Sequence, residues 1–538
     1  MKNLIENLFT EKTSGLKKFG ITEPVNQKDY LIDGQILQWN GEFQEVRSPV
    51  YFKTPNGYDN YIGSYPLMGE PEALKALEAA RAAYNHGSGE WPTMKLEQRI
   101  ACMRNFINLM KENRDEVVKL LMWEIAKSLS DAEKEFDRTV EYIIDTIEAV
   151  KNLDRSSSRF EMKQQVIAQI RRAPLGVVLC MGPFNYPLNE TYTTLIPALM
   201  MGNTVIFKPP KLGVLLHLPL LKVFQKAFPK GVVNTVYGDG QKVIAPLMES
   251  GKIDVLAFIG SSRVADILKK QHPKPHRLRC ILGLEAKNPA IILPDAEIDL
   301  TVKECIAGSL SFNGQRCTAL KIIFVHQEIL DKFLDKFCTA IENLKPGMPW
   351  DENVNITPLP ESGKPAYLSS LIEDAVIHGA RIINSSGGIQ NKSFFFPAVL
   401  SPVNSRMRIY HEEQFGPLIP VVPFKGIEEP MEYVVRSNYG QQASIFGQDS
   451  GVIAGLMDTL VNQLCRVNIN SQCQRGPDEY PFTGRKDSAE GTLSVSDALR
   501  VFSIRTLIAA KENDLNKRII SEILKDQKSK FLSTDYIF

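Results

Sequence analysis

The sequence has no apolar run that approaches the roughly 18 residues of a membrane-spanning helix. Its start, MKNLIENLFTEK, also lacks the apolar core of a signal peptide. The net charge of +1 over 538 residues gives no overall electrostatic reason to bind nucleic acid or an anionic membrane. We therefore expect a cytoplasmic protein whose partners include neither a membrane nor a nucleic acid.

Metal-ligand patterns are equally scarce. The 8 cysteines contain no CxxC pair and no regular spacing, and the 7 histidines do not cluster in the sequence. This usage suits free thiols in a reducing compartment and argues against a structural zinc site, so we expect no metal. The cysteines are Cys102, Cys180, Cys280, Cys305, Cys317, Cys338, Cys465 and Cys473.

The composition is that of an ordinary globular chain, with 43% hydrophobic and 23% charged residues. Its length allows about two to four domains. Apolar strand-like runs alternate with helical patterns in the middle of the chain. Gly176–Met181 predicts a buried strand, Glu190–Met201 a helix and Thr204–Phe207 the next strand. Such alternation is typical of an α/β fold with a parallel sheet.

The flanking segments have other patterns. Residues 1–28 are polar and irregular, which predicts an N-terminal extension, and residues 30–37 predict two short strands around a turn. Residues 71–150 predict a series of helices. Residues 157–173 predict a polar strand, and residues 511–538 a charged, amphipathic appendage.

One cysteine has unusual surroundings. Cys317 lies in SLSFNGQRCT, where small and polar residues replace the apolar partners of a packed core thiol. Gly314 allows a close approach of the backbone, and the cation of Arg316 would favour the thiolate. Most cysteines are nevertheless inert core residues. The surroundings favour a reactive thiol over that alternative.

Polar residues also follow several predicted strands, where open α/β sheets bind ligands. In GPFNYPLN, Asn185 lies between two prolines, so a rigid loop presents one amide donor that suits an oxyanion site. The alternative is an asparagine that bonds its own turn. In FKPPKLG, Lys208 and Lys211 could bind a phosphorylated ribose or could be solvated lysines.

Two further junctions could contact a dinucleotide. Ser261 in FIGSS precedes a predicted helix, whose N-terminus suits a pyrophosphate, although an ordinary serine cap has the same pattern. Gly238 in GDGQKV is a weaker candidate for cofactor binding, because the stretch lacks the third glycine of the dinucleotide fingerprint.

The order and spacing of five motifs resemble the aldehyde dehydrogenase superfamily over roughly residues 30–510. The motifs are PFNYP with Asn185, FKPP with Lys208, FIGSS with Ser261, GQRC with Cys317 and EEQFGP with Glu413. The resemblance implies an α/β fold with a parallel-sheet dinucleotide domain, an α/β catalytic domain and a protruding β oligomerisation arm. It also implies a homodimer or homotetramer.

The resemblance suggests domain limits. An N-terminal extension (1–28) and a C-terminal extension (512–538) would flank a dinucleotide-binding domain, an oligomerisation arm and a catalytic domain. The dinucleotide-binding domain would comprise 29–156 and 174–282, the arm 157–173 and 493–511, and the catalytic domain 283–492.

The resemblance also implies roles for individual residues. Cys317 resembles the nucleophile, and Asn185 with the Cys317 backbone N–H resembles the oxyanion hole. Lys208 and Glu413 resemble ribose contacts, and Ser261 resembles a pyrophosphate contact. Lys211 stands where NAD-preferring members often carry an acid, and a cation there would attract a 2′-phosphate. We therefore expect NADP as cofactor, with NAD possible.

Four residues resemble the substrate-phosphate ligands of one branch of this superfamily, the NADP-dependent non-phosphorylating glyceraldehyde-3-phosphate dehydrogenases. They are Arg138 in FDRTVEY, Tyr186, Arg316, and Arg475 in QRGPDEYPF. Guanidinium groups bind phosphate with charge-assisted hydrogen bonds, although any one arginine alone could be a solvated surface charge. The implied reaction oxidises glyceraldehyde 3-phosphate to 3-phosphoglycerate through a thiohemiacetal and a thioester, without inorganic phosphate.

One position departs from the family. The usual deacylation glutamate of LELGGK aligns with Gly283 in LGLEAK, and an acid stands two residues later, at Glu285. In a strand these positions share a face and lie roughly 7 Å apart, so Glu285 could replace the missing base. It could instead be a local salt-bridge partner. Three rival functions stay open: oxidation of another small aldehyde, acyl transfer to a thiol such as coenzyme A, and a non-catalytic scaffold.

Overall fold

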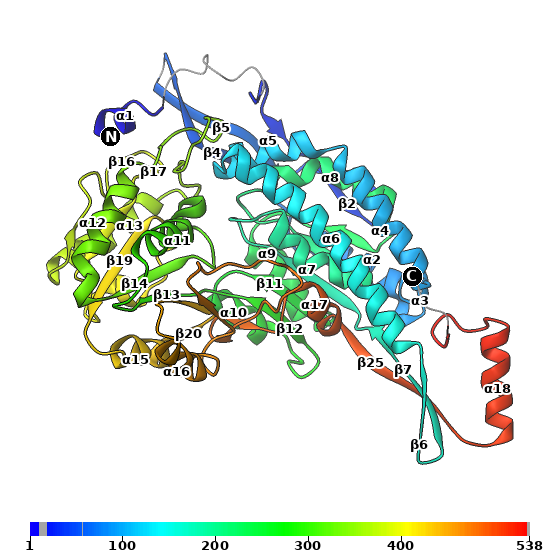
Figure 1. Ribbon diagram of the computed structural model, residues 1–538. Coiled ribbons are helices and arrows are strands. Elements are labelled where there is room, and N and C mark those ends of the chain that lie inside the picture. Colours follow the sequence, from blue (N-terminus) through cyan, green and yellow to red (C-terminus); the bar gives the residue numbers. More distant parts are fainter. Residues whose placement is uncertain (10–18, 56, 535–538) are drawn as a thin grey trace.

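The computed structural model describes residues 1–9, 19–55 and 57–534 (Figure 1). Part of the predicted N-terminal extension (10–18) and the end of the C-terminal extension (535–538) lie outside the described residues. The rest of the N-terminal extension is less irregular than predicted, since it contains helix α1 (Lys2–Glu6) and strand β1 (Val25–Asn26). Within the described part of the chain, no helix combines the length and apolarity needed to cross a membrane.

The predicted parallel α/β architecture is confirmed. A six-stranded sheet has the order β10-β9-β8-β11-β12-β24, and all its pairs are parallel except β12 with β24. Its strands are β8 (Val177–Met181), β9 (Thr204–Lys208), β10 (Val233–Thr235), β11 (Val255–Ile259), β12 (Arg279–Gly283) and β24 (Ala489–Glu490). The connecting helices are α7 (Asn189–Met200), α8 (Leu218–Ala227), α9 (Gly240–Glu249) and α10 (Ser262–Gln271).

A second sheet has seven strands in the order β15-β18-β19-β14-β13-β21-β22. Its strands are β13 (Asn288–Ile292), β14 (Leu320–His326), β15 (Arg381–Ile382), β18 (Ala398–Ser401), β19 (Leu418–Phe424), β21 (Gln442–Phe446) and β22 (Arg466–Ile469). Alternate strand residues face opposite cores, because side chains of a strand point to opposite faces. Ile291 packs in one core, with residues of helices α13, α15 and α16, and Ile292 packs in the other, with residues of α11 and α12.

The helices that accompany the second sheet are α11 (Ile298–Leu310), α12 (Leu330–Glu342), α13 (Lys364–Ile377), α14 (Arg408–His411), α15 (Glu428–Arg436) and α16 (Ser450–Leu460). Helix α17 (Val495–Val501) follows them in the chain but packs in the core of the first sheet. Small two-stranded pairs join β16 (Gln390–Asn391) to β17 (Phe394–Phe395) and β20 (Tyr439–Gly440) to β23 (Arg485–Lys486).

The helical region before the first sheet follows its sequence pattern. It comprises α2 (Glu70–Tyr84), α3 (Glu90–Thr93), α4 (Leu96–Lys111), α5 (Arg114–Ile125) and α6 (Leu129–Ser157). In α6, the apolar stripe from Ala132 to Val150 is buried, and the side chain of Ser128 caps the helix by accepting the Asp131 backbone N–H. The short hairpin of β2 (Asp29–Ile32) and β3 (Gln35–Gln38) also matches its prediction.

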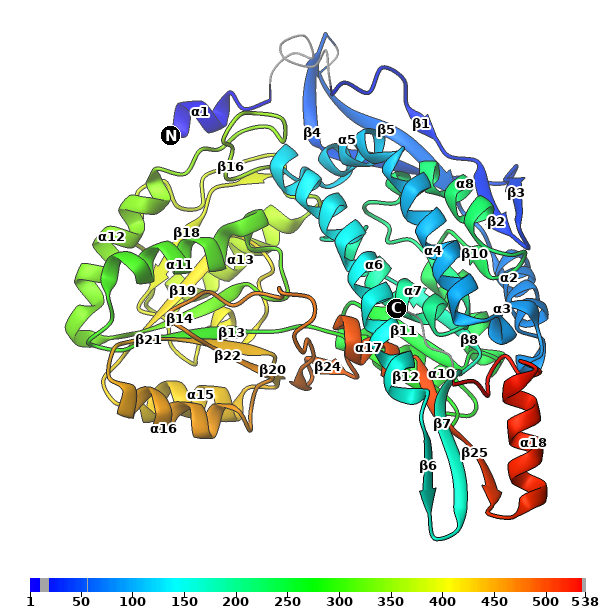
Figure 2. The ribbon, with the colours of Figure 1, turned by 45° about the vertical axis from the view of Figure 1, so that its right-hand side comes forward.

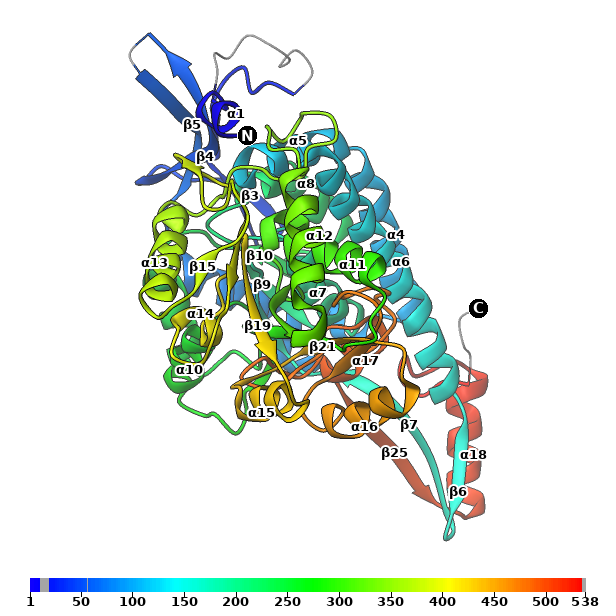
Figure 3. The same cartoon turned by 60° about the vertical axis from the view of Figure 1, so that its left-hand side comes forward.

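Two hairpins extend in opposite directions from the body (Figure 3). Strands β4 (Phe43–Thr54) and β5 (Gly57–Pro66), which we did not predict, form one of them. The predicted polar strand 157–173 forms the other, as β6 (Phe160–Lys163) and β7 (Val166–Pro174), because Gln164 and Gln165 turn the chain with φ of 48° and 61°. Strand β25 (Ser503–Lys511) pairs with β7, and α18 (Asp514–Lys525) lies beside this arm (Figure 2).

Candidate active site

The carboxyl ends of four neighbouring strands bring the predicted site residues to one edge of the six-stranded sheet. Met181 at the end of β8 pairs with Lys208 at the end of β9, and Ile259 at the end of β11 pairs with Gly283 at the end of β12. The loops that carry Asn185, Ser261 and Glu285 begin at these ends, because parallel strands present their carboxyl ends on the same side.

A cavity of about 900 Å³ lies at this edge, and residues of the Cys317 loop also line it. Ten of the twelve predicted residues line it: Arg138, Asn185, Tyr186, Lys211, Ser261, Glu285, Arg316, Cys317, Glu413 and Arg475. Lys208 and Gly238 do not belong to the lining. A Cβ at Gly238, whose φ is +117°, would lie 2.9 Å from the Met68 carbonyl oxygen, so packing alone explains that glycine.

The side chain of Cys317 is half-buried at the cavity and lies among charges of both signs. Burial raises the pKa of Cys317, the charge of Glu190 raises it further, and the cations of Lys321 and Arg475 oppose the rise. Arg316 is not one of the main influences on this pKa, and the effect of its cation on the thiolate stays a prediction. Its guanidinium instead donates to the carbonyl oxygens of Ala307 and Gly308, at 3.1 and 3.0 Å.

The raised pKa gives a pH prediction for Cys317 itself. A raised pKa keeps the thiol neutral at pH 7, so the thiolate fraction grows only as pH increases. The rate of iodoacetamide alkylation at Cys317, followed by peptide mass mapping, should therefore still rise above pH about 8.5, where an ordinary cysteine is half ionised. A rate that is already constant below pH 8 would contradict the buried environment.

Asn185 is held by a buried ion pair that the sequence analysis missed. The Nζ of Lys127 donates to the Asn185 carbonyl oxygen at 2.7 Å and lies 3.6 Å from the centre of the Tyr186 ring. Lys127 also pairs with Glu135, whose carboxylate accepts the backbone N–H groups of Leu188 and Asn189 at 3.0 and 3.1 Å. Both charged side chains are fully buried, and no sequence pattern distinguishes them from residues of a solvated helix face.

The Asn185 amide points toward the nucleophile loop. Its Nδ2 donates one hydrogen to the Gln315 carbonyl oxygen at 2.8 Å. A primary amide carries two hydrogens, so a second donor is available for an oxygen bound near Cys317. The side chain is buried, and the ion pair behind it limits its movement.

The sheet edge beside the cavity carries both cations and acids. Burial lowers the pKa of Lys208 to about 8, Lys211 lowers it further and Asp239 opposes the change. Lys211 is exposed. Ser261 is the N-cap of α10, and its hydroxyl accepts the Val264 N–H at 3.4 Å. Because Ser261 also lines the cavity, the N-terminus of α10 faces it.

Two carboxylates at this sheet edge already accept hydrogen bonds from other groups of the protein. Glu285 accepts the backbone N–H of Ser262 at 2.8 Å, at the same helix N-terminus where we predicted a pyrophosphate. Glu413 accepts the Ala286 N–H at 3.1 Å and forms an ion pair with Lys321. Lys321 also donates to the Cys317 carbonyl oxygen at 3.0 Å, so it joins the predicted ribose contact to the nucleophile loop.

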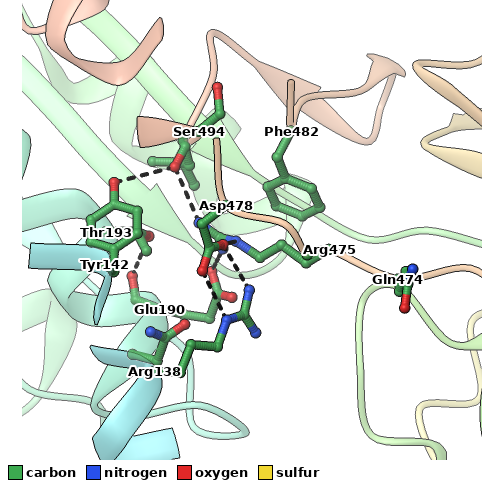
Figure 4. A network of polar contacts seen from close by, with 12 residues as sticks. Arg138, Tyr142, Glu190, Thr193, Gln474, Arg475, Asp478, Phe482 and Ser494 are labelled. Carbon is green, nitrogen blue, oxygen red and sulfur yellow. Dashed lines mark hydrogen bonds and ion pairs between the residues drawn. The ribbon is translucent and has the colours of Figure 1, made fainter. Parts of the chain in front are cut away.

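Two arginines of the cavity contact two carboxylates that the sequence analysis did not single out, those of Asp478 and Glu190 (Figure 4). Arg138 forms a bidentate ion pair with Asp478, with N–O distances of 2.9 and 2.7 Å. Arg475 contacts Asp478 at 3.1 Å, forms an ion pair with Glu190 and lies 4.5 Å from the centre of the Phe482 ring. With Arg316, the three arginines and two carboxylates leave a net charge of 3 − 2 = +1.

The geometry thus places a cysteine and an amide donor beside the carboxyl ends of a parallel sheet and a cluster of arginines. The model of the aldehyde dehydrogenase family matches residues 47–507, and the chain belongs to this family. The predicted family and enzyme class are confirmed.

The individual relatives of this chain include enzymes that are named for different aldehydes. The chain is 32% identical over 469 residues to the NADP-dependent glyceraldehyde-3-phosphate dehydrogenase of Streptococcus equinus, covering 86% of this chain and 96% of that one. It is 28% identical over 481 residues to the malonate-semialdehyde dehydrogenase of Bacillus cereus, covering 88% and 97%. The NADP complex of the Bacillus halodurans NADP-dependent glyceraldehyde-3-phosphate dehydrogenase has a TM-score of 0.82 and 29% identity, covering 90% of this chain and 99% of that chain.

Proposed function

We propose that the protein oxidises glyceraldehyde 3-phosphate to 3-phosphoglycerate with NADP and without inorganic phosphate. The observation that carries this proposal is a single cavity that contains Cys317, Asn185 and three arginines. The Streptococcus and Bacillus halodurans relatives, which are named for this substrate and for NADP, support it.

In the proposed reaction, the Cys317 thiolate adds to the aldehyde carbon. The oxygen of the resulting thiohemiacetal accepts hydrogen bonds from Asn185 Nδ2 and the Cys317 backbone N–H. NADP, when bound, supplies the acceptor for the hydride. The thioester on Cys317 is then cleaved by water, whose proton passes to a carboxylate, and the acid product leaves.

The residues at the sheet edge fit a phosphorylated dinucleotide. Lys208 and Lys211 would hold the ribose and its 2′-phosphate, and the N-terminus of α10 with Ser261 would hold the pyrophosphate. Glu413 would contact the other ribose if its ion pair with Lys321 opens. Glu285 must leave the Ser262 N–H before a pyrophosphate can bind there.

The acidic partners of the arginines, Glu190 and Asp478, favour a second candidate class of substrate. A net charge of +1 balances a singly charged carboxylate better than a phosphate dianion, so the cavity would also suit a small aldehyde acid. The malonate-semialdehyde dehydrogenase of Bacillus cereus is a relative named for such a substrate.

Initial rates of NADPH formation test both candidates. Glyceraldehyde 3-phosphate is expected to be oxidised at the same rate with and without inorganic phosphate, and more efficiently than unphosphorylated glyceraldehyde or malonate semialdehyde. A preference for the semialdehyde would replace the first candidate by the second. A requirement for added coenzyme A would instead identify an acyl-transferring enzyme.

Replacing Glu190 by glutamine should shift the balance between these substrates. The change removes one negative charge beside Arg475, so kcat/KM for the phosphorylated aldehyde relative to malonate semialdehyde should rise about tenfold. The matched control is Glu361→Gln, which alters another carboxylate of the cavity that is paired with Lys364. An unchanged substrate ratio in Glu190→Gln would show that Glu190 does not set the charge preference.

We propose that the protein is a cytoplasmic homodimer or homotetramer assembled through its arm, with the domain limits suggested above. The arm exposes apolar side chains that water disfavours, among them Ile504 (48% exposed), Leu507 (56%) and Ile508 (41%). Leu507→Glu should therefore lower the oligomeric mass measured by light scattering. The control Ile519→Glu, on the exposed face of α18, should leave that mass unchanged.

A further inference from the structure

A second cavity is lined by residues that are distant in sequence from Cys317. It has a volume of about 690 Å³ and shares no lining residue with the first cavity. Its walls come from the beginning of α4, the end of α6, strand β7 and the C-terminal segment 528–531, which returns from α18 toward the body. The arm strand and the C-terminal extension therefore meet at one hollow.

The lining of this cavity is strongly basic. Five cations and one acid among its lining residues give a net charge of 5 − 1 = +4, and these residues are Arg99, Arg171, Arg172, Lys528, Lys530 and Asp154. Some cations have protein partners. Arg171 forms an ion pair with Asp154, Arg172 donates to Ser503, and Lys528 pairs with Asp526 on the surface.

Arg99 has no such partner. Its Nε is buried without a hydrogen bond, and the structure gives no ion pair or side-chain hydrogen bond for its guanidinium among the described residues. Burial and the nearby Arg171 lower the pKa of Arg99 to about 10, although Asp154 opposes the change. A buried Nε–H without an acceptor is costly, so a ligand that accepts its hydrogen bond would remove that cost.

We propose that this cavity binds a small phosphorylated metabolite through Arg99, Arg171 and Lys530. The planar donor groups of arginine match the oxygens of a phosphate, and a volume of about 690 Å³ leaves room for an organic group beyond the phosphate itself. Arg171 also donates to the Phe531 carbonyl oxygen at 3.1 Å, so a bound anion would tie the C-terminal segment to the arm.

Binding to the full-length protein, without aldehyde or NADP, tests the proposal. The probes are inorganic phosphate and glycerol 3-phosphate, with glycerol as the uncharged comparison, and the readouts are calorimetry and the thermal midpoint. We expect both phosphates to bind and to raise the midpoint, glycerol 3-phosphate more tightly than inorganic phosphate. Equal affinities would assign the site to inorganic phosphate alone and overturn the metabolite proposal.

Variants separate this site from the one at Cys317. Arg99→Met and Lys530→Met should each weaken glycerol 3-phosphate binding at least tenfold, and Lys530 is exposed, so its variant does not depend on repacking. Arg475→Met should not change this binding, and neither should Arg104→Met, an exposed arginine on the same helix as Arg99.

Binding that is lost in Arg475→Met but kept in Arg99→Met and Lys530→Met would assign the phosphate to the active site and overturn the proposal. So would the absence of binding at millimolar concentrations. Glycerol 3-phosphate resembles the proposed substrate, so the comparison of Arg475→Met with Arg99→Met and Lys530→Met separates binding at this cavity from binding at the first one.

Discussion

Replacing Glu285 by glutamine is expected to lower the steady-state rate about 100-fold while the first turnover of NADPH formation is kept. The reason is that thioester hydrolysis needs a base, and the family's usual position for it is Gly283. Glutamine keeps the size of the side chain and loses its ability to accept a proton from water. Stopped-flow absorbance at the NADPH band measures the burst and the steady state separately.

Two further variants make this experiment decisive. A Cβ at Gly283 would lie 3.3 Å from Ile259 Cγ1 and 3.5 Å from Leu493 Cδ1, which is tight but needs only small adjustments. Gly283→Glu in the Glu285→Gln background should therefore restore hydrolysis if a base is what is missing. Glu361→Gln serves as the control. An unchanged steady-state rate in Glu285→Gln would exclude Glu285 from the mechanism.

The position of Glu285 also predicts an effect on the cofactor. Glu285 accepts the Ser262 N–H at the N-terminus of α10, where a pyrophosphate would compete for the same donor. Bound NADP is therefore expected to release Glu285 toward the thioester. The same Glu285→Gln variant should bind NADP more tightly, because a negative charge has left the pyrophosphate site.

Lys127→Met is expected to be the most damaging change away from the reacting atoms. It leaves Glu135 buried without its cation, and breaking a buried ion pair costs about 3–5 kcal/mol. It also frees the Asn185 carbonyl, so the oxyanion donor loses its position and kcat should fall about 100-fold. Denaturant unfolding and initial rates measure the two effects.

A double variant separates stability from positioning. Lys127→Met with Glu135→Gln removes both charges, so most of the lost free energy of unfolding should return. The activity should stay low, because nothing then holds the Asn185 loop through Lys127. A full recovery of kcat in the double variant would show that Lys127 contributes only to stability.

Local patterns determined much of the fold. The apolar stripe of α6, the buried strand β8 and the caps and turns after each strand are properties of neighbouring residues, so periodicity predicts them. The hairpin β4–β5 was missed because its strands are partly exposed and lack a clear alternation. The turn at Gln164 and Gln165 was missed because neither residue is typical of a left-handed turn.

For the site, the sequence by itself supplied the reactive residue types and, through the order of five motifs, the family. Only the tertiary structure decided what those residues touch. Arg475 and Glu190 are 285 residues apart, and Arg138 and Asp478 are 340 apart, so no local pattern reports their ion pairs. The charge balance around a side chain and its degree of burial both depend on many such neighbours that are distant in sequence. That is why Cys317 could be found in the chain, while the raised pKa of its thiol could be found only in the fold.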